Sequence, residues 1–242
     1  MQEDCFFGLV SPVKIGKISS VPNHVPTALI SLSSSATTSW ASSAHLPFLL
    51  SPTGRSKFTI TALLNSSVPA AQSAIKTYSL PPTTKAYSSP QDLAADPDIN
   101  IMICNTRLDT HYQTIIDSIK SGKNVYVEWP FASKREHIDD LIEASKHSGS
   151  RIAVGLQGRC APAALKIRDI LQANSLGAVL NSEVRAFGGT KDREILPAGF
   201  KYFAQKDVGG NPIVISFGHA LDTVLSVLGK LDERGVKVRT QI

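Results

Sequence analysis

The sequence predicts an α/β protein. A Rossmann-like parallel sheet with helices on both faces is followed by an incomplete α+β second domain with an open sheet. Short apolar runs alternate with segments of helical spacing from residue 27 to residue 154, a pattern typical of a parallel sheet with right-handed crossovers. After residue 159 a long two-faced segment replaces this alternation, as in a sheet covered on one side. We therefore divide the chain into an irregular arm (1–24), a parallel α/β domain (25–155) and a second part (156–242).

The expected strands of the first sheet are short and apolar. They are residues 27–32, 58–64, 99–104, 125–127 and 152–154. Between them apolar side chains recur at helical spacing. Pro69 stands at the start of one helix, and Gly122 and Gly149 end two others. The expected helices are residues 40–50, 69–78, 91–95, 110–121 and 133–148.

The second part is expected to hold fewer elements. Residues 162–173 and 213–228 have the periodicity of helices, and residues 179–187 alternate between two faces as one long strand. So few strands would leave sheet edges unpaired. We therefore expect either a homo-oligomer formed through this sheet or a truncated product.

Composition argues against several classes of function: nucleic-acid binding, membrane spanning, secretion and metal binding. The net charge is +5, but the basic residues are scattered, which favours a solvated surface over direct nucleic-acid binding. No apolar run is long enough for a membrane helix, and the start does not read as a secretory signal. The three cysteines have no metal-ligand spacing, so we expect no metal site. A cytoplasmic protein, or a nuclear one, is the resulting expectation.

The residues that directly follow the strands are the main candidates for ligand contacts. In an open parallel sheet, ligands bind outside the carboxyl ends of the strands. These residues are 33–35, 65–67, 105–107, 128–130 and 157–159.

Several landmarks then occur in an informative order. His111 is followed by Gly122-Lys-Asn-Val-Tyr-Val-Glu-Trp-Pro130, then by Arg159 with Pro162, and last by Gly209-Gly210, His219 and Asp222. This series resembles the Gfo/Idh/MocA oxidoreductase family. The pairs Glu128-Trp129 and Gly158-Arg159 are similar to the branch that contains the fungal galactose-regulon repressor. The resemblance implies a dinucleotide-binding domain over 25–155 and a partial substrate or dimerisation domain over 156–242.

The resemblance also implies a cofactor, NADP or NAD. Ser31, Ser33 and Ser34 stand where the family has a glycine-rich phosphate loop, and hydroxyl groups can replace some of its donors. Asn65 and Ser66 occupy the position of the acidic residue that binds the ribose of NAD, so NADP is allowed. The other expected cofactor contacts are Thr106, His111, Glu128, Trp129, Pro130, Gln157 and Arg159. The alternatives are a ligand-free serine loop, an ordinary Asn-Ser turn, an exposed His111 and a surface ion pair at Arg159.

The expected catalytic residues are His219 and Asp222. Three positions apart on one helix, they would allow Asp222 to orient His219 as a base, although a lone helical histidine is also commonly structural. The chain departs from the family twice here, because Trp129 replaces a catalytic lysine and Ile215 replaces an aspartate. Indole cannot exchange a proton near neutral pH.

Three functions remain open. The first is hydride transfer between nicotinamide and a sugar-like or secondary-metabolite alcohol or carbonyl. The second is a non-catalytic, NAD(P)-sensing transcriptional co-regulator like the galactose repressor. The third is a truncated protein with neither role, which the serine-rich loop and the short second part favour.

Overall fold

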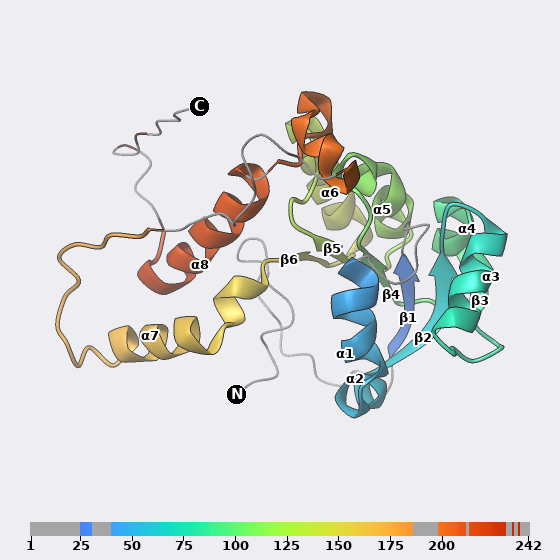
Figure 1. The fold of residues 1–242 in the computed structure, drawn as a ribbon, viewed down its shortest axis with the longest axis horizontal. Helices are drawn as coiled ribbons and strands as arrows, with labels where there is room; N and C mark the ends of the chain where they lie inside the picture. Colours follow the sequence, from blue (N-terminus) through green and yellow to red (C-terminus); the bar gives the residue numbers. More distant parts are fainter. Residues whose placement is uncertain are drawn as a thin grey trace.

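The computed structural model describes residues 25–30, 40–185, 198–211, 213–230, 234 and 237 (Figure 1). Within them, six parallel strands form one sheet in the order β3-β2-β1-β4-β5-β6. The strands are β1 (Val25–Ile30), β2 (Phe58–Leu64), β3 (Lys85–Tyr87), β4 (Ile101–Cys104), β5 (Asn124–Glu128) and β6 (Ile152–Gly155). The predicted Rossmann-like sheet is confirmed. Only β3 was not predicted, because three residues are too few to show a period.

Apart from the short helix Pro52–Lys57, which was not predicted, the helices of this domain follow their strands as expected. They are η2 (Ala41–His45), α1 (Leu46–Leu50), α2 (Pro52–Lys57), α3 (Val68–Thr77), α4 (Pro90–Ala95), α5 (His111–Lys120) and α6 (Arg135–Ser148). Three of them begin in the same way. Ser51, Ser67 and Ser89 each accept a hydrogen bond from a backbone N–H of the first helical turn, and a proline follows within two residues. Serine caps and early prolines favour helix initiation, so local sequence fixes these starts.

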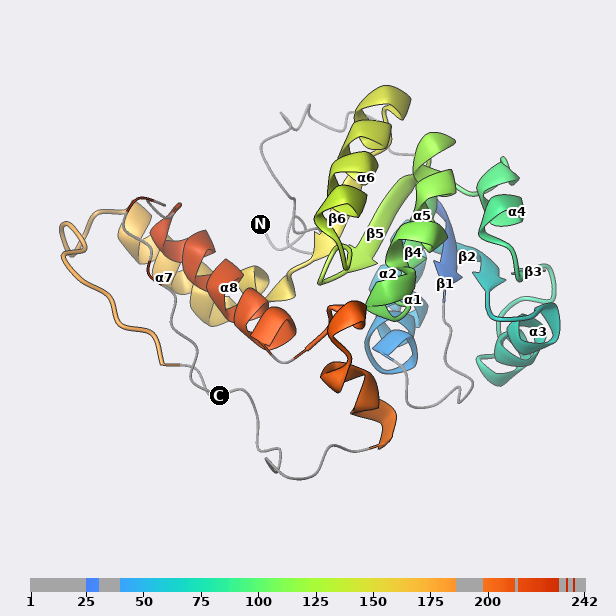
Figure 2. The same cartoon turned by 90° about the horizontal axis from the view of Figure 1, so that it is seen from above.

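Helices cover both faces of the sheet, and each face has its own core. Residues that alternate along the strands point to opposite faces. Met102, Val125 and Val154 pack with residues of α4, α5 and α6, whereas Ile103 and Tyr126 pack with residues of α1 and α3. Cys104 is also buried in the first of these cores. The helices on the two faces of the sheet can be followed in Figures 1 and 2. Two buried faces explain why the strands read as apolar runs in the sequence.

The second part differs from the prediction. It contains η4 (Gln157–Cys160), α7 (Pro162–Gln172), η5 (Ala198–Ala204), η6 (Lys206–Val208), η7 (Ile213–Phe217) and α8 (Gly218–Leu228), and α7 lies beside α8 (Figure 2). The strand predicted over 179–187 is wrong for its described part, because residues 179–185 form no regular element. Leu180 is 95% exposed there, and no described strand pairs with this segment. The expected open second sheet, and self-association through it, therefore find no support in the described residues.

Some predicted features fall outside these residues. The arm 1–24 and the serines Ser31, Ser33 and Ser34 are among them. None of the helices in the described ranges is long and apolar enough to cross a membrane.

Candidate functional site

A cavity of about 100 Å³ lies at the carboxyl ends of β4 and β5. The loops after both strands reach it, and so do η5 and η7 of the second part. Its lining residues are Thr106, Arg107, Leu108, His111, Glu128, Trp129, Pro130, Tyr202, Gly210 and Ile215. The structure thus brings together five of the residues expected to bind a cofactor, together with the isoleucine that replaces the family aspartate. This is the edge at which open parallel sheets bind ligands.

Glu128, at the end of β5, is held from two sides. His45 Nε2 donates to its Oε1 at 2.6 Å, and the Tyr126 hydroxyl donates to the same oxygen at 3.2 Å. Both His45 and Tyr126 are buried. A Cβ atom at Gly155 would lie 2.7 Å from the other carboxylate oxygen, so only glycine leaves room for it. The carboxylate is therefore fixed in place, and His45 joins η2 to the turn after β5.

His111 is buried and joins two loops. Its Nδ1 lies 3.0 Å from the carbonyl oxygen of Pro130, and its Nε2 lies 3.0 Å from that of Thr106. Burial lowers the pKa of His111, although these carbonyl oxygens favour the protonated ring. The alternative of an exposed helix-end histidine is wrong, since His111 is 2% exposed. With both nitrogens against backbone oxygens, its role is to hold the loops after β4 and β5 together.

Trp129 forms a wall of the cavity and also a contact between the two parts of the chain. Its Nε1–H donates to the carbonyl oxygen of Val214 at 3.0 Å. A Cβ atom at Gly218 would lie 2.5 Å from Nε1, so α8 approaches the indole closely because its first residue is glycine. The indole N–H is thus engaged in a hydrogen bond within the protein rather than free for a ligand.

Asn105, directly after β4, has unsatisfied hydrogen-bonding capacity. Its amide nitrogen and oxygen are both buried and have no hydrogen-bond partner among the described residues. Leaving such groups unpaired costs about 1–3 kcal/mol each, so native structures rarely keep them without a partner. The next residue, Thr106, lines the cavity. A polar ligand at this edge would satisfy the amide, so the site fits a group with both donors and acceptors, such as a dinucleotide.

The end of β2 forms a compact turn. Asn65 Oδ1 accepts from the backbone N–H of Ser66 at 2.7 Å, and Ser67 caps α3. These contacts agree with the turn alternative for Asn65 and Ser66. No carboxylate stands at this end of β2, so a 2′-phosphate would meet no acidic side chain from residues 65–67.

The predicted pair His219 and Asp222 is not formed. The carboxylate of Asp222 instead accepts two hydrogen bonds from Arg159, one of them from Nε at 2.9 Å and the other from Nη2. An arginine fork matches a carboxylate better than an imidazole does. The prediction that Asp222 orients His219 is therefore wrong. Arg159 thus forms an ion pair, as in the alternative to its expected contact with a cofactor. Gln157, the other cofactor contact expected in this segment, is exposed in η4.

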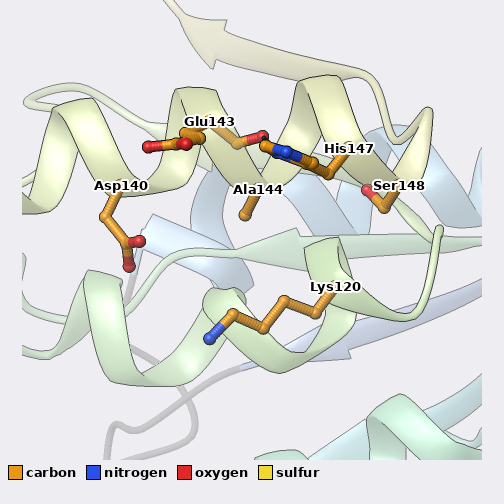
Figure 3. A pocket seen from close by; sticks show the side chains of 6 residues that line it. All are labelled: Lys120, Asp140, Glu143, Ala144, His147 and Ser148. Atoms are coloured by element: carbon orange, nitrogen blue, oxygen red, sulfur yellow. Dashed lines mark hydrogen bonds between the residues drawn. The ribbon is translucent and has the colours of Figure 1, made fainter.

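A larger hollow, of about 350 Å³, lies between α5 and α6 (Figure 3). Lys120 of α5 lies across from Asp140, Glu143 and His147 of α6. Lys120 is the last residue of α5, whose first residue, His111, lies at the carboxyl edge of the sheet. The hollow therefore lies toward the opposite edge from the expected ligand site, and we do not assign it a function.

Comparisons with known proteins agree with this geometry. The model of an oxidoreductase family with an NAD-binding Rossmann fold, Gfo/Idh/MocA, matches residues 38–156, and the model of the Gal80p C-terminal domain matches residues 162–241. The chain belongs to the Gfo/Idh/MocA oxidoreductase family. A dehydrogenase of Aspergillus oryzae, aclE, is 32% identical over 73% of this chain. The regulatory protein GAL80 of Saccharomyces cerevisiae is 24% identical over 86% of it.

Solved structures of the family share the fold. A super-repressor mutant of Gal80p from S. cerevisiae matches 84% of this chain with a TM-score of 0.76 at 21% identity. An NAD-binding oxidoreductase from Klebsiella pneumoniae matches 86% with a TM-score of 0.67 at 18% identity. The chain spans about half the length of these relatives, with 47% of aclE and 53% of the Gal80p chain covered.

Sequence reasoning did not single out three residues of this site. His45 lies in a helix with no motif, and Tyr202 lies between the strand expected at 179–187 and the helix expected at 213–228, where no element was predicted. Asn105 was included only as a strand-end residue. Family motifs gave no signal for any of them, because their importance arises from tertiary contacts with Glu128, the cavity and the sheet edge.

Proposed function

We propose that this chain binds a nicotinamide dinucleotide at the carboxyl edge of its sheet, and that the cavity beside Trp129 is the place of hydride transfer to or from a small substrate. The unsatisfied amide of Asn105 carries the proposal, because it offers a buried donor and acceptor where the family binds its cofactor. The bound dinucleotide would supply the redox chemistry. Asn105 and Thr106 would bind it, while His111 and Glu128 hold the surrounding loops in position.

We further propose that NADP is accepted at least as well as NAD. The support is the absence of a carboxylate at residues 65–67, where an acidic side chain would repel a 2′-phosphate.

The first test is thermal unfolding with and without NAD and NADP at millimolar concentration. A ligand at a hundred times its Kd stabilises the folded state by about 2.7 kcal/mol, so the midpoint rises. We expect a clear rise, larger with NADP. Asn105→Ala should reduce it, because the buried amide is lost. Asn100→Ala, at an exposed position before β4, is the matched control and should leave it unchanged. No rise with either cofactor in the unaltered, cooperatively folded protein would refute the proposal.

A second candidate is a dinucleotide-sensing co-regulator, favoured by the Gal80p model over residues 162–241 and by the use of the Trp129 N–H within the fold. Retained dinucleotide binding without oxidation of NADPH or NADH by any carbonyl compound would support it over the enzyme.

A further inference from the structure

Few of the cavity's side chains are free to exchange a proton with a substrate. Arg107 is paired with Asp109 through two bonds of 2.6 Å and keeps its charge at any working pH. His111 has both ring nitrogens against backbone carbonyl oxygens, and Trp129 donates its N–H to Val214.

The remaining polar groups are also engaged. Glu128 accepts from His45 and Tyr126 at one oxygen, so its carboxylate already holds η2 against the end of β5. Thr106 accepts from the Thr110 hydroxyl at 2.9 Å, and aliphatic hydroxyls are poor acids.

Tyr202 is different. Its phenol lines the cavity and makes no hydrogen bond within the described part of the chain. The guanidinium carbon of Arg107 lies 6.0 Å from the centre of its ring. Burial raises the pKa of Tyr202, while the charge of Arg107 counteracts the rise. The phenol therefore keeps its proton at neutral pH, with the Arg107 guanidinium over its ring.

The rest of the wall indicates what the phenol would meet. Leu108, Trp129, Pro130 and Ile215 are apolar, and Gly210 packs against Leu108 and Ile215. Unpaired polar groups for a polyhydroxylated ring are scarce. A volume of about 100 Å³ is smaller than the roughly 150 Å³ of an apolar cavity that holds benzene, so this cavity admits the carbonyl-bearing edge of a flat ring rather than a whole ring.

We propose that Tyr202 is the proton donor of this cavity and that its substrate is a flat, weakly polar aldehyde or ketone placed against Trp129. This inference rests on the proposed function, since the reaction needs a reduced nicotinamide dinucleotide. The carbonyl carbon gains a hydride from the dinucleotide and is reduced to an alcohol carbon. The carbonyl oxygen takes the phenolic proton, leaving a phenolate that solvent reprotonates and an oxidised dinucleotide.

The first arm of the test uses a carbonyl that cannot be reduced here. Benzamide is titrated against the protein carrying Trp40→Phe, so that fluorescence reports Trp129 alone. We expect Tyr202→Phe to weaken benzamide binding about fivefold, the loss of one neutral hydrogen bond. Tyr112→Phe, which removes a hydroxyl bonded to Asp140 on the helical face, is the matched control and should leave binding unchanged.

The second arm measures dinucleotide oxidation with 4-nitrobenzaldehyde. Tyr202→Phe should lower kcat by about 10²–10⁴, the usual contribution of a positioned proton donor, while the Kd of the dinucleotide stays within twofold. If the unaltered protein binds no dinucleotide, the proposed function fails and this inference fails with it. Dinucleotide binding with no reduction of the aldehyde, or a kcat within threefold after Tyr202→Phe, would overturn the assignment of Tyr202 alone.

Discussion

Glu128 is a motif residue whose side chain makes structural contacts within the fold, in addition to lining the candidate ligand site. The motif predicted a place for this carboxylate at the carboxyl edge of the sheet, and the structure confirms that place. Its orientation, however, comes from His45, 83 residues away in sequence. The side-chain exposures of the pair are 5% for His45 and 13% for Glu128, so the two groups were removed from water together. Breaking such a pair leaves one buried group without a partner.

His45→Ala should lower the free energy of unfolding by about 1–3 kcal/mol, because the carboxylate of Glu128 keeps its burial and loses its strongest donor. Urea denaturation followed by circular dichroism measures the change. His147→Ala, an exposed histidine on α6, is the control and should stay within about 0.5 kcal/mol of the unaltered protein. Equal effects of the two substitutions would show that the His45–Glu128 contact contributes little.

At the scale of elements, periodicity predicted most of what local sequence determines. Apolar runs buried on both sides predicted the strands, and apolar side chains at helical spacing predicted most of the helices, with Pro69 at the start of α3. The short helix α2 was not predicted. The same reasoning failed at residues 179–185, where an alternating pattern exists but no described neighbouring strand completes it. A strand depends on its partner, whereas a helix satisfies its own backbone.

The candidate site, like the secondary structure, was predicted only in part. Five cavity residues and Ile215 followed from strand ends and motif, but Tyr202 enters from η5, whose position depends on tertiary packing. The partner of Asp222 could not be predicted either. Helical spacing placed it near His219, but Arg159 competes for it from η4. Spacing along a helix predicts which residues are neighbours on that helix. It cannot predict that a cation from another element, here Arg159, will lie closer.

Gly218→Ala tests the packing of α8 on Trp129. Alanine normally favours a helix over glycine by up to about 1 kcal/mol. Here a Cβ atom would lie 2.5 Å from the indole Nε1, so we expect destabilisation of about 1–3 kcal/mol from overpacking instead. In a Trp40→Phe background, the emission of Trp129 should also shift as its bond to Val214 is disturbed. Ser226→Ala, later in α8, is the control. A more stable protein with unchanged emission would contradict this packing.

At the scale of the whole molecule, a contact from Trp129 joins the η7–α8 segment to the Rossmann domain, and a contact from Arg159 of η4 holds the same segment within the second part. Trp129 bonds to Val214 just before α8, and Arg159 binds Asp222 within it. These two contacts lie at different positions along the η7–α8 segment, so together they fix its direction as well as its place. The cavity depends on this arrangement, because Ile215 lines it from η7 while Trp129 lines it from the sheet edge. Weakening these two contacts would therefore alter the shape of the candidate site without changing its polar groups.

The Arg159–Asp222 pair can be tested by a double-mutant cycle with Arg159→Gln, Asp222→Asn and the combination. The pair is partly buried, with side-chain exposures of 30% and 13%, and makes two bonds. We expect a coupling energy of about 1–3 kcal/mol from urea denaturation. The exposed pair Arg135–Asp139 on α6 is the matched control, and a solvated pair four residues apart should give about 0.3–0.5 kcal/mol. Coupling no larger than this control would show that the Arg159–Asp222 pair does not help to hold α8 against η4.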